Sequence, residues 1–148
     1  MRRSKDYTFD SLIPFLREVV ASPYWAWADG MMCRHPAGIF NPWRYDEAKA
    51  GTCEQSSAGL PDLDDPATAG AVLALLAELS PCALRIKPGG EYTGWEIWSA
   101  PVVAPPRTMM LGWGATCGIA AAWAIAYGLP KLREDLDRYL GRDTPEVH

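Results

Sequence analysis

The sequence is poor in the side chains that enzymes most often use for proton transfer and metal binding. It has only two histidines, His35 and His148, and none of its four cysteines belongs to a CxxC pair. It also lacks a glycine-rich phosphate-binding loop. These absences argue against a zinc site, a disulfide framework and a nucleotide-hydrolysing loop, and no metal or cofactor is expected.

The chain also lacks an excess of positive charge. Its acidic residues outnumber its lysines and arginines by 18 to 14, which gives a formal net charge of −4. Duplex DNA and anionic membranes attract basic surfaces, so neither is an expected partner. Charged residues recur from Asp6 to Glu18 and leave no uninterrupted apolar run of the secretory type. These features predict a cytoplasmic protein with reduced thiols.

One stretch, from Thr108 to Pro130, contains no charged residue at all. Its length matches the roughly 20 apolar residues that cross a bilayer, and a membrane-associated role through 108–130 is one alternative. Helix start and stop signals inside the stretch favour another interpretation. Thr116 is a good N-cap, Gly128 a good residue to end a helix, and Pro130 follows it. We therefore predict a strand to Trp113, a glycine turn and a buried helix over 117–127.

The remaining pattern predicts an α+β protein with a single domain over residues 1–148. Apolar spacing predicts helices over 11–21, 66–79 and 131–140, with Asp65 as the N-cap and Pro66 as the first residue of the second helix. Short alternating runs predict strands within 24–45, 82–87, 95–99 and 109–113. We expect a small antiparallel or mixed sheet of four to five strands, with helices packed on it as an α/β sandwich.

The expected helix over 117–127 is apolar on all sides, so both of its faces need cover. The last helix can cover one face. A second copy of the chain can cover the other, which predicts a homo-oligomer with this helix near the interface.

Two groups of residues suggest chemistry only weakly. Cys33 and His35 lie two apart and would share one face of a strand, but no second histidine or acidic residue completes a nucleophile or metal site. Gly112 and Gly114 precede Thr116 at an expected helix N-terminus, where backbone N–H groups can hold an anion. Glycine is also common in such turns for purely structural reasons.

Aromatic residues interleaved with basic ones are the better binding candidates, because together they can stack a flat group and hold a phosphate. Trp95 and Trp98 should lie on opposite faces of one strand, so at least one of them is expected to line a surface or interface. The predicted ligand- or partner-binding residues are Arg34, His35, Trp43, Arg44, Trp95, Trp98 and Arg107.

The segment that begins at Asp62 reads DLDDPATAGAVLALL. It resembles a recurring segment, roughly D-L-x-D-P-A-T-x-G-x-L-L-A-L, of small uncharacterised proteins encoded by tailed phages and prophages. Trp27 with Gly30, and Trp95 and Trp98 ahead of the glycine turn at Thr116, are similar in placement. The resemblance covers about half of the chain and departs after Thr116, where those proteins have a polar-faced helix. It implies an accessory protein of phage origin, and it supplies no catalytic residues.

The expected function is therefore a non-enzymatic binding protein in the cytoplasm of a host cell. It would sequester a host protein or a small nucleotide signal, and thereby inhibit a host defence system. A small enzyme that uses Cys33 and His35 is the alternative from a different class.

Overall fold

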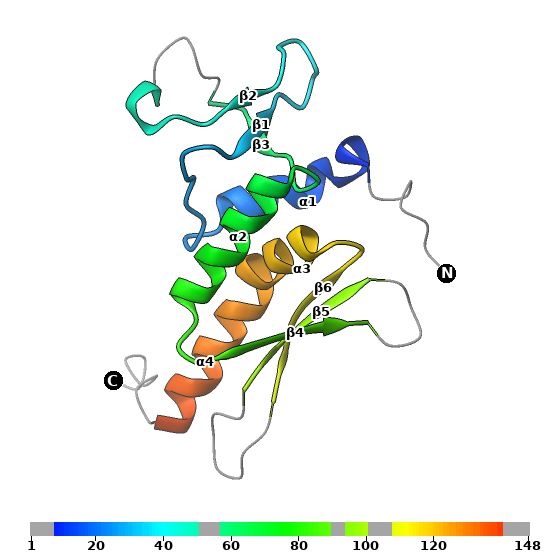
Figure 1. Ribbon diagram of the computed structural model, residues 1–148. Coiled ribbons are helices and arrows are strands. Elements are labelled where there is room, and N and C mark those ends of the chain that lie inside the picture. The colour runs from blue at the N-terminus through cyan, green and yellow to red at the C-terminus, as the bar shows by residue number, and fades with distance from the viewer. Residues whose placement is uncertain (1–7, 51–56, 90–93, 101–107, 141–148) are drawn as a thin grey trace.

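The computed structural model describes residues 8–50, 57–89, 94–100 and 108–140. It is an α+β structure, as the sequence predicts (Figure 1). The strands differ from the prediction: in the described ranges they form two separate antiparallel sheets of three strands each, in place of one sheet of four to five. The difference arises because the first three strands are only two or three residues long and pair solely with one another.

The first sheet has the strand order β2-β1-β3. Its strands are β1 (Met32–Arg34), β2 (Trp43–Arg44) and β3 (Leu60–Pro61). Proline limits their length: Pro42 stands before β2, and Pro61 is the last residue of β3, where a missing N–H does least harm. Gly30 has a φ of 94° and its N–H donates to the carbonyl of Tyr45, which brings β1 alongside β2.

The second sheet has the strand order β4-β5-β6, from β4 (Leu84–Pro88), β5 (Trp95–Ser99) and β6 (Met110–Gly114). The register places Ile86 opposite Ile97 and Ile97 opposite Gly112, so these residues share one face. Ile97 is fully buried there. We call this the inner face because the helices pack on it.

The helices are α1 (Phe9–Ala21), α2 (Pro66–Leu79), α3 (Cys117–Trp123) and α4 (Leu129–Leu140). The predicted caps of α2 and α3 are confirmed: Asp65 accepts from the N–H of Thr68, and Thr116 accepts from the N–H of Ile119. For α1 the N-cap is Thr8. This helix therefore begins two residues before the predicted start at residue 11.

The predicted end of the central helix at Gly128 is wrong. The helical path continues from α3 through a π-helical turn, η3 (Ala124–Gly128), directly into α4. Within that turn the N–H of Leu129 donates to the carbonyl of Ala124, five residues back. A proline inside a regular helix removes a hydrogen bond and collides with the carbonyl four residues earlier. The wider π turn just before Pro130 gives its ring room, so the helix passes through the stop signal.

The chain itself buries α3, so the reason given above for a second copy at this helix does not hold. Five consecutive residues of α3, from Gly118 to Ala122, are buried within one chain. The sheet covers one side and α2 the other, where Gly118 lies close to Leu63 and Ala69. Within the described parts of the chain, no helix is both long and apolar enough to cross a membrane.

A single cluster of buried side chains connects both sheets to the helices. It contains Met31 and Leu60 from the first sheet and its approach, Ile97 and Leu111 from the second sheet, and Leu16 from α1. The cluster joins the two sheets through the helices: in Figure 1 the first sheet lies beyond the N-terminal end of α2, and the second sheet lies beside α3.

The close contact of the helices with β6 depends on glycine. A Cβ atom at Gly112 would collide with the carbonyl oxygen of Ala120 and would lie 2.8 Å from the backbone nitrogen of Ala124. A Cβ at Gly128 would collide with the backbone of Leu111. We expect Gly112→Ala to lower the free energy of unfolding by about 1–3 kcal/mol or more, because backbone cannot yield as a side chain can.

Gly70→Ala is the matched control, because a Cβ at this α2 position meets nothing within 4 Å. Removing a mid-helix glycine should raise stability by about 0.5–1 kcal/mol. Urea unfolding of both variants tests the difference. A Gly112→Ala protein as stable as the wild type would show that the helices are not held this close to β6.

Candidate functional site

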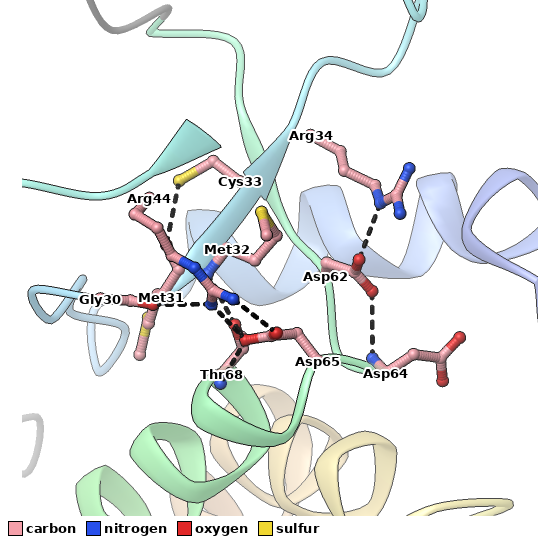
Figure 2. A network of polar contacts seen from close by, with 10 residues as sticks. All are labelled: Gly30, Met31, Met32, Cys33, Arg34, Arg44, Asp62, Asp64, Asp65 and Thr68. Carbon is pink, nitrogen blue, oxygen red and sulfur yellow. Dashed lines mark hydrogen bonds and ion pairs between the residues drawn. The ribbon is translucent and has the colours of Figure 1, made fainter. Parts of the chain in front are cut away.

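Two arginine–aspartate pairs join the first sheet to the start of α2 (Figure 2). Arg44 forms a bidentate pair with Asp65, at 2.6 Å from Nη1 to Oδ2 and 3.0 Å from Nη2 to Oδ1. Arg34 donates from Nε to Asp62 Oδ2 at 2.7 Å. Thr68 completes the link: its hydroxyl donates to Asp65 Oδ2 and accepts from the N–H of Met32.

The ionisation of these carboxylates follows from their partners. The hydrogen bonds from Arg44 hold the pKa of Asp65 to about 2, so Asp65 is fully ionised at neutral pH. Burial raises the pKa of the neighbouring Asp64, and the charge of Asp62 adds to that shift. Asp65 thus serves as a helix cap and an ion-pair partner. That role accounts for the Asp65 carboxylate without assigning it acid–base chemistry.

The side chains of Trp43 and Arg44 contact other residues of the first sheet and the start of α2. The guanidinium of Arg44 bonds Asp65 through both Nη atoms and also donates to the carbonyl of Gly30. The half-buried indole of Trp43 lies over Gly59 and beside Cys33. This geometry gives both residues a structural role and does not aim them at a common ligand.

Arg34 and His35 do come together, in a groove of about 580 Å³ between α1 and the loop after β1. We call it the Arg34 pocket. Phe9 and Phe40 line it as well. The Arg34 side chain is 45% exposed, and its Nη atoms have no hydrogen-bond partner among the described residues. The imidazole of His35 accepts at Nδ1 from the N–H of Ala37, so Nε2 is the ring nitrogen that remains for a ligand.

The two phenylalanines of the Arg34 pocket were not identified from the sequence. The Arg34 guanidinium lies 5.8 Å from the centroid of the Phe9 ring, and Phe40 meets His35 edge-on at 5.3 Å between centroids. Phe40 is itself exposed. The only hint of this site in the sequence was the aromatic residue Phe40, a few positions after His35.

Trp95 and Trp98 lie on the second sheet, apart from the Arg34 pocket, so the predicted residues do not form one site (Figure 1). Their predicted placement on opposite faces of β5 is confirmed by the strand register. Trp98 points away from the helices, with the Lys87 ammonium 4.8 Å from its ring centroid and its Nε1 donating to Glu96. Arg107 lies outside the described residues.

The face of the second sheet that carries Trp98 is turned away from the helices, and we call it the open face. The register groups six side chains there: Arg85, Lys87, Glu96, Trp98, Met110 and Trp113. Trp113 is 49% exposed and Met110 is 40% exposed. Neither was singled out from the sequence, because both sit in the uncharged stretch that suggests only core.

The glycine turn before α3 serves packing. Gly112 and Gly114 are buried, and a Cβ at Gly114 would collide with Ile119. The Thr116 hydroxyl caps the helix by accepting a hydrogen bond from the N–H of Ile119. Close helix–strand contact therefore explains the residues proposed for anion binding, and no anion-binding geometry is needed to account for them.

Cys33 and His35 do not form a nucleophilic pair in this geometry. Cys33 is buried, and its burial raises the pKa of the thiol to about 12, so it is not a thiolate at neutral pH. Its Sγ lies 3.9 Å from the carbonyl oxygen of Met31. Among the described residues, no group of three or more histidine, cysteine or acidic side chains could hold a metal ion.

No protein-family model, curated protein or solved structure matches this chain.

The Arg44–Asp65 pair predicts how stability changes in acid. The pKa of Asp65 is about 2 in the folded chain, against an ordinary value of 3.8. Its stabilising contribution is complete above about pH 4 and is lost as the pH falls towards 2, because the unfolded chain takes up the proton first. Asp65→Asn keeps a good N-cap but removes the charge. We expect this variant to be less stable at pH 7 and to lose less stability than the wild type between pH 4 and 2.

Urea unfolding at stepped pH values measures that difference. Asp64→Asn is the matched control, because the pKa of Asp64 is raised instead of lowered. Between about pH 4 and 2, Asp64→Asn should lose as much free energy of unfolding as the wild type, or more. If the free energy of unfolding fell equally with pH in the wild type and in Asp65→Asn, the lowered pKa of Asp65 would be contradicted.

Proposed function

We propose that the protein is a non-enzymatic binding protein that holds a protein partner against the open face of the second sheet. The observation that carries this proposal is the exposure of Trp113 and Met110, at 49% and 40%, on the same sheet face as Trp98, which none of the described helices covers. Tryptophan is among the residues most enriched at the energetic centres of protein interfaces.

The arrangement of the open face supports a protein partner over a small ligand. Its side chains spread over three strands, and neither groove described in this chain includes them. Arg85 and Lys87 on β4 and Glu96 on β5 place charge of both signs beside the tryptophans. Tryptophan, methionine and arginine are all enriched at protein–protein interfaces relative to the rest of the surface.

The resemblance to phage and prophage proteins adds a setting to this proposal. A small accessory protein of that origin would work in the cytoplasm of the host cell. By sequestering a host protein on the open face, it would inhibit the defence pathway to which that protein belongs.

The Arg34 pocket supports a second candidate function, the binding of a small anionic ligand such as a nucleotide. The specific observation is that Arg34, whose guanidinium Asp62 holds through Nε, lines the groove. Phe9, Phe40 and His35 offer rings for a flat group beside that charge.

Truncation of Trp113 tests the proposed protein interface. We expect Trp113→Ala to weaken a partner captured by the wild-type chain by about 2 kcal/mol or more, which is at least about thirtyfold in affinity. Phe40→Ala is the matched control, because Phe40 is a similarly exposed aromatic residue that lies away from the open face, in the loop between β1 and β2. Binding constants of the purified partner for the three proteins give the readout. Equal loss in both variants, or none in Trp113→Ala, would refute a role for the open face.

The second candidate is tested with nucleotides added to the purified protein. Calorimetric titration with a panel of nucleoside monophosphates and cyclic dinucleotides should show binding that Arg34→Gln abolishes and Trp113→Ala preserves. Asp62→Asn should weaken binding less, because it loosens Arg34 without removing it. No heat with any member of the panel would leave the open face as the better-supported site.

A further inference from the structure

The edge strand β4 presents backbone hydrogen-bonding groups that no described residue uses. The carbonyl of Ala83 accepts from Ala100, and the N–H of Gly89 donates to Gly94. Antiparallel partners alternate between hydrogen-bonded and non-hydrogen-bonded pairs. Residues 83, 85, 87 and 89 therefore point their backbone groups at β5, and Leu84 and Ile86 point theirs outward. Among the described strands, β4 pairs only with β5.

An apolar groove of about 430 Å³ runs along this edge on the inner side of the sheet. Leu73, Ala74 and Ala77 of α2 form one wall of the groove, and Leu84 and Ile86 of β4 form the other. Ile86 is 45% exposed. A strand added beside β4 would place every second side chain under α2 in this groove, because side chains alternate across a sheet.

On the opposite side of the same edge, β4 carries only positive charge. Arg85 and Lys87 alternate with the groove residues and belong to the open face. Arg85 is exposed, with no ionic or hydrogen-bond partner among the described residues. Lys87 faces the Trp98 ring, and Glu96 is its neighbour across the ladder. Acidic side chains directly opposite two basic residues stabilise a strand pair, and basic ones destabilise it.

A second copy of this chain is a poor occupant of the edge. Two copies of β4 could pair as antiparallel strands through the outward backbone groups of Leu84 and Ile86. Two registers allow this, with the two-fold axis at residue 85 or at residue 86. The first places Arg85 opposite Arg85 of the second copy, and the second places Arg85 opposite Lys87 of the second copy. Either register sets like charges against each other at the shortest distance across the strands.

We infer that β4 accepts an extended segment of a partner protein in which acidic and apolar residues alternate, as an added antiparallel strand. The apolar side chains enter the groove under α2, and the acidic ones lie opposite Arg85 and Lys87. The backbone of Leu84 and Ile86 supplies hydrogen bonds, so affinity comes from the ladder and selectivity from the two rows of side chains. This inference rests on the proposed function, because it names the chemistry of the partner that the second sheet would bind.

The probe for the test is a fluorescein-labelled synthetic peptide in which aspartate alternates with valine over the length of a strand. Its controls are the same peptide with lysine at each aspartate, and one with the same composition but the two residue types grouped in blocks. Fluorescence anisotropy should show the alternating acidic peptide binding at least about tenfold tighter than either control. Arg85→Glu combined with Lys87→Glu should reverse the preference to the lysine peptide.

Hydrogen exchange of the wild-type protein locates the bound peptide without any variant. The outward amides of Leu84 and Ile86 should exchange more slowly with the acidic peptide present. The Lys87 amide already donates within the sheet and should change little. Slowed exchange confined to other elements, or equal binding of all three peptides, would overturn the proposal.

Two variants separate this inference from the proposed function. Ile86→Pro removes an outward N–H that an edge strand can spare, and should abolish peptide binding, whereas Ile86→Val should retain it. Trp113→Ala lies on β6 and should leave peptide binding intact while partner binding is lost. Peptide binding lost in Ile86→Val and in Ile86→Pro alike would point to a side-chain contact and would refute strand addition.

Discussion

The closeness of the helical layer to strand β6 is the constraint on which the rest of the structure depends. Gly112, Gly114 and Gly128 let backbone meet backbone there, and alanines at 120, 121 and 124 keep the facing helix thin. Because α3 lies so near the sheet, its other side is free to receive α2 at the close contact of Gly118 with Ala69. The position of α2 in turn determines where Asp65 meets Arg44 and where the groove beside β4 lies.

The two sheets contribute different things to this arrangement. The first is small and is held by polar contacts: two arginine–aspartate pairs and the hydroxyl of Thr68 tie it to the N-terminus of α2. The second has longer strands, carries the buried Ile97 and Leu111, and has one face that none of the described helices covers. The exposed aromatic side chains that suggest a protein interface thus lie on the second sheet. Its inner face is buried under the helices and stabilises it, which leaves its open face for binding.

Local signals predicted local structure well. The cap at Asp65, the proline after it, the strand over 95–99 and the cap at Thr116 all depend on residues within four positions of each other, and all are confirmed. The failures involve distant residues. Gly128 and Pro130 read as a helix stop because nothing near them reveals that Gly128 must lie against Leu111 and that a π turn precedes the proline. Likewise, nothing in the sequence around Arg44 indicates that an aspartate holds it, because Asp65 lies 21 residues away. Pairing of that range leaves no periodic pattern in a single sequence.

The π turn Ala124–Gly128 also sets the rotational phase of α4. A π turn accommodates one residue more than an α turn, and each helical residue advances the direction of a side chain by about 100°. The π turn takes up this extra residue, so deleting a single residue between Ala124 and Gly128 would restore a regular helix and leave the directions of the α4 side chains nearly unchanged. If a regular helix instead carried the same number of residues through this segment, the side chains of α4 would be rotated by about 100°, and Leu132, now fully buried, would leave the core. The π turn therefore decides which face of α4 is turned towards the rest of the protein.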